Sequence, residues 1–119
     1  MTIIPNHSEF QTHTAIIDWL RIAVPGAIVL HITNNPRSAI AGAKAKRMGM
    51  LKGAADILFI HQGVVAFIEV KTPRGKQSKA QIEFQDRCVE NMVPYAVVRG
   101  VGDVQAFLTD LGVPVRCTA

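Results

Sequence analysis

Two stretches of the chain, one near each end, carry apolar residues at helical spacing. Ser8 and Gln11 have the S-x-x-Q spacing of a capping box, which predicts a helix that starts near Glu9 and ends before Pro25–Gly26. The apolar stripe of this helix consists of Phe10, Ile16, Ile17, Leu20 and Ala23. Asp103 can cap the second helix. Its positions i, i+3, i+4 and i+7 are occupied by Val104, Phe107, Leu108 and Leu111.

Short apolar runs that are rich in β-branched residues lie between these two helices and predict strands. Two of the runs are separated only by Gln62–Gly63, so together they predict a β-hairpin. The predicted strands span residues 27–32, 55–61, 64–71 and 95–99.

Two further helices complete the pattern. Ser78 and Gln81 repeat the capping-box spacing and predict a helix that runs to about Met92. Residues 38–48, rich in Ala, Gly and Lys, predict a short helix after a turn at 34–36. The order helix, strand, helix, hairpin, helix, strand, helix predicts an α/β fold, a small mixed β-sheet flanked by α-helices. We expect a single domain over residues 1–119.

Composition narrows the class of protein. The chain has 119 residues, of which 49% are hydrophobic, and this argues against a disordered protein. The longest apolar run, residues 63–68, is far too short to cross a membrane, and residues 1–10 lack the features of a secretory signal. The two cysteines, Cys88 and Cys117, form no C-x-x-C pair. We therefore expect a cytoplasmic protein with no membrane segment.

The distribution of charge points to a polyanionic partner. The formal net charge is +4, from 13 Lys and Arg residues against 9 Asp and Glu. Between Trp19 and Ala55 there is no acidic residue at all. The basic residues in that stretch are Arg21, Arg37, Lys44, Lys46, Arg47 and Lys52. Such a segment suggests nucleic acid, although a solvated helix face that merely lacks acids would look the same.

Two carboxylates lie near the first and the last residue of the predicted hairpin, Asp56 in its first strand and Glu69 in its second. A two-residue turn at Gln62–Gly63 pairs His61 with Val64, and in that register Asp56 faces Glu69 directly. Opposed side chains of this kind lie ~5 Å apart at Cβ, and like charges placed there repel each other. A cation between them would remove the repulsion. A hard divalent ion such as Mg²⁺ suits carboxylate ligands.

Lys71 lies two residues beyond Glu69 and projects from the same face of the strand. Its charge could orient a water nucleophile or offset charge on a phosphate in the transition state. Two alternatives stay open. The three residues could form an edge salt bridge, and a one-residue slip of the hairpin would turn Asp56 to the wrong face.

These residues carry a resemblance to a known family. Asp56 followed by Glu69–Val70–Lys71 resembles the D…E-x-K core of the PD-(D/E)XK nuclease superfamily. A glutamate in the first helix, a Gly-rich approach to Asp56, and E-V-K-T-P-R-G-K-Q-S before a helix with Gln81 resemble the virus-type replication-repair nuclease (VRR-NUC) family. The match covers residues 9–108. One departure is Ala55, where the family usually has proline.

The resemblance implies a restriction-endonuclease-like fold and a metal-dependent, structure-selective DNA endonuclease. It implies hydrolysis of phosphodiester bonds in branched DNA such as four-way (Holliday) junctions, a role in DNA repair, Mg²⁺ or Mn²⁺ as cofactor, and a homodimer. Asp56 and Glu69 would bind the metal together with the backbone carbonyl of Val70, and Lys71 would be the catalytic lysine.

The resemblance also assigns roles to Glu9 and Gln81. Glu9 would reach the metal directly or through water, and Gln81 would support the site. Each has a simpler interpretation, because acids are favoured in the first turn of a helix and Gln81 is placed to complete a capping box. Glu9 lines up with His13, Ile16 and Leu20 on its helix, which favours an inward direction. His13 itself could lie behind the metal ligands.

Basic residues on both sides of the D…E-x-K core are expected to contact the DNA backbone. They are Lys44, Lys46, Arg47 and Lys52 before Asp56, and Arg74, Lys76 and Lys79 after Lys71. Trp19 and Tyr95 look like core residues, so few side chains remain to read bases. Two other functions stay open: a nucleic-acid-binding module without catalysis, and a nuclease that cuts flaps or reads a sequence.

Overall fold

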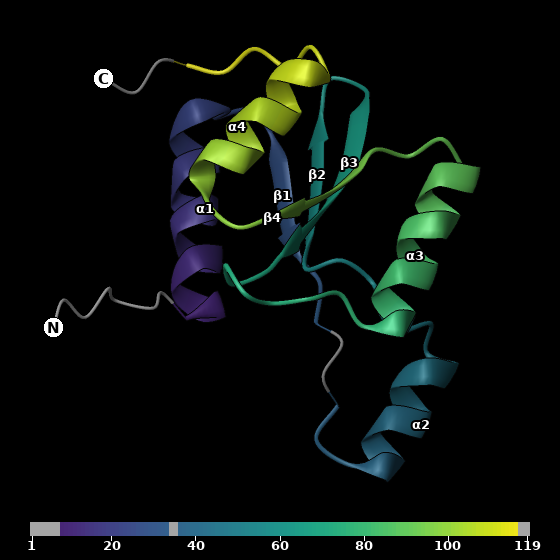
Figure 1. The fold of residues 1–119 in the computed structure, drawn as a ribbon. Helices are drawn as coiled ribbons and strands as arrows, with labels where there is room; N and C mark the ends of the chain where they lie inside the picture. Colours follow the sequence, from purple (N-terminus) through teal and green to yellow (C-terminus); the bar gives the residue numbers. More distant parts are fainter. Residues whose placement is uncertain (1–7, 34–35, 117–119) are drawn as a thin grey trace, which may run out of the picture.

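The computed structural model describes residues 8–33 and 36–116. Residues 34–35 of the expected turn, and Cys117, lie outside the described residues. Figure 1 shows the elements in chain order: α1 (Glu9–Ala23), β1 (Ile28–His31), α2 (Ala39–Arg47), β2 (Ile57–His61), β3 (Val64–Val70), α3 (Lys79–Glu90), β4 (Tyr95–Val98) and α4 (Val101–Asp110). The predicted order of helices and strands is confirmed.

The strands form one mixed sheet in the order β1-β2-β3-β4. β1, β2 and β3 pair antiparallel, and β4 pairs parallel to β3. In the β2–β3 hairpin, His61 is opposite Val64, as predicted. Gln62 and Gly63 both have positive φ, 46° and 83°. Positive φ at both positions is what a type I′ turn requires, and this turn fixes the register of the hairpin.

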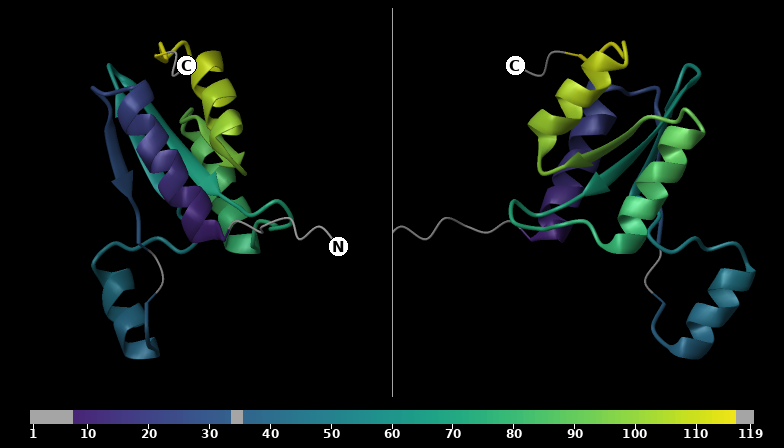
Figure 2. Two further views of the ribbon diagram at one scale, coloured as in Figure 1. Left: turned by 90° about the vertical axis from the view of Figure 1, so that its left-hand side faces the viewer. Right: turned by 45° about the vertical axis from the view of Figure 1, so that its right-hand side comes forward.

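α1 and α4 pack on one face of the sheet and form the larger part of the core (Figure 2). Ile16 and Leu20 of α1 and Leu108 of α4 are fully buried there. The sheet contributes alternate residues of β2 and β3, as expected for a strand with one face turned to a core. These residues are Ile57, Phe59, Ala66, Ile68 and Val70.

α3 covers the opposite face, over a smaller apolar cluster. Phe84 of α3 packs edge-on against Phe67 of β3, with ring centroids 5.0 Å apart. Cys88 lies one turn further along α3 and is buried, so it is a core residue. Tyr95 packs against the same cluster. The two apolar clusters hold the sheet between α3 and the α1–α4 pair.

α2 stands apart from the rest of the molecule. Figures 1 and 2 show it away from the sheet, beyond the end at which α1 and α3 begin and nearest to the first turn of α3. None of its residues is buried. Ile40 in α2 and Met48 at its end are 84% and 80% exposed. The capping side chain of Ser38 accepts a hydrogen bond from the N–H of Ala41 and fixes the start of the helix.

The start of α4 differs from the prediction. The helix begins at Val101 after Gly100, and no side chain caps it. Asp103 lies in the first turn, and its carboxylate accepts a hydrogen bond from the N–H of Arg99 at 2.8 Å. An aspartate can satisfy a backbone donor upstream of a helix as well as at its cap, so the helix starts earlier than the capping rule suggested. Among the described residues, no helix is long and apolar enough to cross a membrane.

Candidate metal centre

Three carboxylates from three separate elements meet at the end of the sheet from which α2 projects. They belong to Glu9 at the start of α1, Asp56 just before β2 and Glu69 near the end of β3. One oxygen of each lies within 4.8 Å of the others. Carboxylate oxygens this close repel one another unless a proton or a cation lies between them. The arrangement therefore has the donor set of a hard divalent cation.

Glu69 is the most deeply placed of the three. Its side chain is completely buried, and among the described residues neither Oε1 nor Oε2 has a hydrogen-bond partner. Burial, and after it the neighbouring carboxyl of Asp56, raises the pKa of Glu69 to about 9. The ammonium group of Lys71 acts in the opposite direction on this pKa. An unpartnered buried carboxyl is rare in proteins, and a metal ligand is one role that explains it.

Asp56 is fixed by hydrogen bonds to both neighbouring strands. Its Oδ2 accepts a hydrogen bond from the N–H of Val70 at 2.8 Å. Its backbone carbonyl accepts one from the N–H of Ile32 at 2.8 Å, just beyond β1. Ile57 pairs with Ile68, and the same register continued by one residue sets Asp56 against Glu69, in agreement with the carboxylate oxygens that lie within 4.8 Å of each other. The ligand role of the Val70 carbonyl stays a prediction.

Glu9 is the first residue of α1, and the capping box of Ser8 and Gln11 sets where that helix begins. Gln11 Oε1 accepts from the N–H of Ser8 at 3.0 Å, and Ser8 Oγ accepts from the N–H of Gln11 at 3.1 Å. The helix dipole favours an acid in this turn whatever its function. The structure adds that Glu9 lies beside Asp56 and Glu69, a contact that helix position alone could not reveal.

Lys71 follows directly after β3, where the parallel pairing with β4 continues. Its N–H donates to the carbonyl of Val98 at 2.9 Å. Because side chains alternate along a strand, Lys71 and Glu69 leave the chain on the same side. The lysine residue is half-buried. Its catalytic role stays a prediction.

Arg99 is a residue of this region that sequence reasoning missed. Its Nη1 donates to the carbonyl of Thr72 at 2.5 Å and to the carbonyl of Gly75 at 2.8 Å. Both carbonyls belong to the loop that leaves Lys71. Arg99 thus fixes this loop from the end of β4. The two partners lie 24 and 27 residues away in the sequence, so no local pattern could have indicated the contact.

Gln81 has the structural role that the capping box predicted. Its Oε1 accepts a hydrogen bond from the N–H of Ser78 at 2.8 Å, and its own N–H donates to Ser78 Oγ at 3.2 Å. The first turn of α3 also lies directly against Gly53, where an added Cβ would be 2.3 Å from the carbonyl oxygen of Ala80. Gln81 therefore lies where α3 meets the segment that leads to Asp56. A direct role in catalysis stays a prediction.

His13, one turn after Glu9 on α1, stacks edge-on against His31 with ring centroids 4.9 Å apart. Burial, and then the neighbouring His31, lowers the pKa of His13, while Asp56 and Glu9 partly offset this shift. His13 therefore lies near Asp56 and Glu9. Its ring contact joins the first half of α1 to the end of β1, a second contact that the sequence did not predict.

The basic residues expected to contact DNA are all exposed. They fall into two groups on the chain. Lys44, Lys46 and Arg47 form the last turn of α2, and Lys52 follows in the linker to Asp56. Arg74, Lys76 and Lys79 follow Lys71 in the loop and the first turn of α3. Their contact with DNA stays a prediction.

A mixed four-stranded sheet between helices, with a carboxylate cluster at one end, defines a small α/β domain with a candidate metal centre. No family model matches the chain, and no curated protein matches it. A solved structure described as a VRR_NUC domain protein superposes with a TM-score of 0.70 at 19% sequence identity. The match covers 92% of this chain and 89% of that one. The protein has the fold of that VRR_NUC domain protein, and the predicted fold class is confirmed.

Proposed function

We propose that this protein is a divalent-metal-dependent nuclease that hydrolyses phosphodiester bonds in DNA. The observation that carries the proposal is the buried, unpartnered carboxyl of Glu69 beside Asp56 and Glu9. The fold shared with a VRR_NUC domain protein supports it. An isolated structural salt bridge would not need a third carboxylate at this point.

Asp56, Glu69 and Glu9 would hold the metal, with the backbone carbonyl of Val70 as a further ligand. Three carboxylates and a carbonyl are a set of oxygen ligands, and this chemistry suits Mg²⁺ or Mn²⁺ rather than a softer ion. When bound, such an ion polarises a phosphoryl oxygen and lowers the pKa of a coordinated water. The hydrogen bond from Val70 to Asp56 orients one ligand before any metal arrives.

Lys71 would act on the reacting groups rather than on the metal. A charged ammonium group has no lone pair, so it cannot be a ligand in that state. It can orient the water that attacks phosphorus, or stabilise charge that develops on the phosphate. Arg99 would act as a positioning residue, because its two hydrogen bonds fix the loop that begins at Lys71.

We propose branched DNA, such as a four-way junction, as the preferred substrate. The basic residues on α2 and those after Lys71 are on different elements, so together they can follow a phosphate backbone around the metal centre. We also propose that the protein acts as a homodimer, because symmetric cleavage of paired strands needs two centres. Light scattering of the protein alone and with junction DNA tests the dimer, and a monomer in both samples would exclude it.

A panel of labelled DNAs tests the proposed function. Single strand, duplex, flap, splayed arm and four-way junction are each incubated with the protein and Mg²⁺, Mn²⁺ or EDTA. We expect cleavage that depends on the metal and is fastest on the junction. If only the flap is cleaved, or if every duplex is cleaved at one sequence, the proposed preference for branched DNA is wrong, and the proposal that the protein is a nuclease stands. Tight binding with no cleavage in either metal would favour a binding module without catalysis.

A further inference from the structure

A groove lies between α2 and α3, beside the candidate metal centre but separate from it. Its volume is about 560 Å³, within the ~300–1,000 Å³ range of sites that take small organic groups. Among the residues that line it are Lys46, Leu51, Lys52, Glu83, Phe84 and Arg87. None of these residues belongs to the carboxylate cluster.

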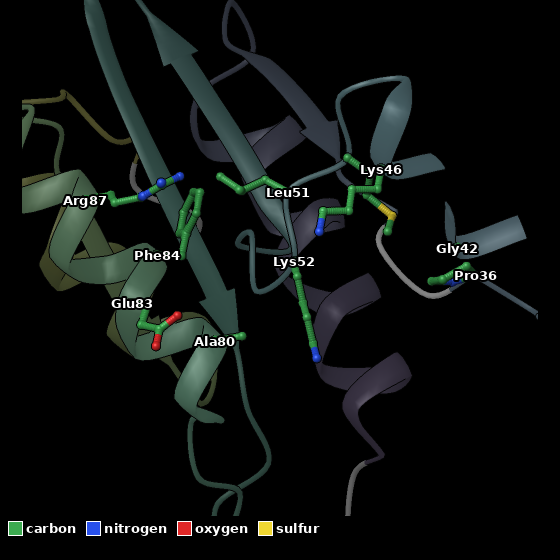
Figure 3. A pocket seen from close by; sticks show the side chains of 10 residues that line it. Pro36, Gly42, Lys46, Leu51, Lys52, Ala80, Glu83, Phe84 and Arg87 are labelled. Carbon is green, nitrogen blue, oxygen red and sulfur yellow. The ribbon is translucent and has the colours of Figure 1, made fainter. Parts of the chain in front are cut away.

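The groove combines apolar walls with positive charge. Figure 3 shows Phe84 of α3 and Leu51 of the linker facing each other, with Arg87 above them. Lys46 of α2 and Lys52 lie on the other side. Glu83 is the one acid among the described residues that line the groove. The groove therefore favours a ligand that is apolar in one part and anionic in another.

The groove lies close to the candidate metal centre, and one linker contributes residues to both. Lys52 lies four residues before Asp56, so their Cα atoms are at most about 14 Å apart. The linker between them is pressed against α3 at Gly53, where an added Cβ would overlap with the backbone of Ala80. One strand of a duplex advances by ~3.4 Å per nucleotide. A strand held at the metal centre would thus reach the groove within a few nucleotides.

We propose that this groove binds an unpaired nucleotide of the DNA substrate, close to the phosphate that is cut. The inference rests on the proposed nuclease function and specifies how a branched substrate is selected. The base would lie mainly on the exposed side chain of Leu51 and against the one edge of Phe84 that the groove leaves open, since Phe84 is only 7% exposed. The adjoining phosphates would contact Lys46, Lys52 and Arg87. Proteins that bind single strands combine a cationic groove with aromatic side chains on which bases stack, and in this groove Leu51 and the edge of Phe84 supply the apolar contact.

Two other occupants fit the groove less well. A continuous duplex hides the faces of its bases and presents sugars and phosphates, which gain nothing from apolar walls. A second copy of the chain would bring its own formal net charge of +4 to a surface that already carries Lys46, Lys52 and Arg87. Charge complementarity therefore favours a nucleic acid, and the apolar walls favour an exposed base.

The test compares binding to three DNAs in the presence of Mg²⁺. The first is a duplex with a three-nucleotide single-stranded extension, and the second has the same extension with abasic sites. The third is the blunt duplex. The abasic extension keeps the phosphate charges and removes only the bases. All variants carry Lys71→Ala so that binding is measured by fluorescence anisotropy without cleavage.

Leu51→Thr removes one apolar wall, and Ile28→Thr serves as its matched control. Leu51 is 42% exposed, and Ile28, on the edge strand β1, is 54% exposed. We expect Leu51→Thr to weaken binding to the intact extension about tenfold, the scale of one lost base stack. Binding to the abasic and blunt DNAs should not change. Ile28→Thr should change none of the three.

Equal affinity of the parent and Leu51→Thr proteins for the intact extension would overturn the proposal. An equal loss on the intact and abasic extensions would also overturn it, because the groove would then contact only backbone. A dimer that dissociates with Leu51→Thr, with no base-specific loss, would assign the groove to a second copy instead. Cleavage by the protein without any substitution is measured on the same DNAs, so that the two proposals are tested separately.

If the protein cleaves DNA with metal but Leu51→Thr causes no base-specific loss of binding, the nucleotide-binding role of the groove is wrong and the nuclease function stands. If binding depends on the bases but no cleavage occurs, the nuclease function is wrong and the nucleotide-binding role stands.

Discussion

Glu69 is a carboxyl group on a strand whose neighbouring residues, Ile68 and Val70, are completely buried. Ionising such a group without a partner costs free energy, because water no longer solvates the charge. The fold nevertheless keeps it beside Asp56 and Glu9. This pattern is typical of a functional residue, because perturbed carboxyl groups gather where ligands or substrates bind.

Without metal, the stability of the protein should fall as the pH rises from about 5 to 9. The pKa of Glu69 is raised from 4.5 to about 9 in the folded state. The folded state therefore holds a proton that the unfolded state has released over this range, and the free energy of unfolding decreases with pH. The slope from one such group is at most about 1.4 kcal/mol per pH unit. Urea unfolding in EDTA measures it.

Glu69→Gln is the matched variant for this measurement. Gln has the same shape and no charge to desolvate, so the decrease between pH 5 and 9 should largely disappear. If the free energy of unfolding decreases with pH equally in the two proteins, Glu69 does not hold the proton.

Lys71→Ala should separate metal binding from chemistry. The metal should still bind, because the charged lysine is not a ligand, and DNA binding should be largely kept. Cleavage of the preferred substrate should drop by roughly 10²-fold or more, the scale of one lost transition-state donor. Single-turnover cleavage in Mn²⁺ measures the loss. If Lys71→Ala cleaves at a rate close to that of the unmodified protein, Lys71 has no catalytic role and forms only a surface salt bridge.

The residues of the site were predictable from the sequence to different degrees. The opposition of Asp56 and Glu69 follows from a short hairpin whose turn fixes the register, so local pattern was sufficient. Glu9 was identified by resemblance, and its approach to the other carboxylates depends on how α1 packs. Arg99 was missed because its partners are distant in sequence and contact it only through the parallel pairing of β3 and β4.

At the scale of elements, α3 and the linker before β2 place the metal centre through one close contact. Gly53 has a φ of +83°, and its backbone lies against Ala80 at the first turn of α3. Only glycine combines this conformation with so close an approach. The contact sets where Asp56 lies relative to α3, and it also forms one boundary of the groove between α2 and α3.

Gly53→Ala should destabilise the protein more than Gly63→Ala does. Both glycines have φ +83°, so each substitution carries a similar left-handed penalty of ~1–2 kcal/mol. A Cβ at Gly63 meets nothing within 4 Å, whereas one at Gly53 would overlap with the carbonyl oxygen of Ala80. Thermal unfolding of the two variants measures the difference. Equal melting temperatures would mean that α3 moves aside without loss of stability.

Helices with strong local signals were predicted best. The capping boxes of α1 and α3 placed both helix starts within one residue, because a cap is a local hydrogen-bonding pattern. α4 starts before its expected cap, because the carboxylate of Asp103 accepts from Arg99 instead. The position of α2 was not predictable, because a helix with no buried residue has no apolar face that fixes its packing.

Across the whole molecule, the basic residues expected to contact DNA lie on α2 and its linker, before Asp56 in the chain, and on the loop and first turn of α3 after Lys71. We expect a polyanion to contact both groups. Contacts between cations and phosphates release counterions, so their number determines how steeply binding depends on salt.

DNA affinity should fall steeply as salt increases, and substitution of Lys44, Lys46 and Arg47 by Gln should flatten that dependence. Each lost phosphate contact reduces the slope of log affinity against log salt by about 0.9. Arg21→Gln, near the end of α1, removes a charge away from the site and should leave the slope nearly unchanged. Fluorescence anisotropy over a salt series measures both. An unchanged slope in the triple variant would exclude α2 from the DNA-binding surface.

The most direct measurement of the central claim is calorimetric titration of Mn²⁺ into the protein and into Glu69→Gln. Glu69 has no hydrogen-bond partner to lose among the described residues, so the variant should fold normally and differ mainly in its ability to hold a cation. If Glu9, Asp56 and Glu69 form a metal centre, the unmodified protein binds Mn²⁺ and Glu69→Gln does not bind it measurably. Identical titrations of the two proteins, or no binding to either, would contradict a metal centre at these three carboxylates.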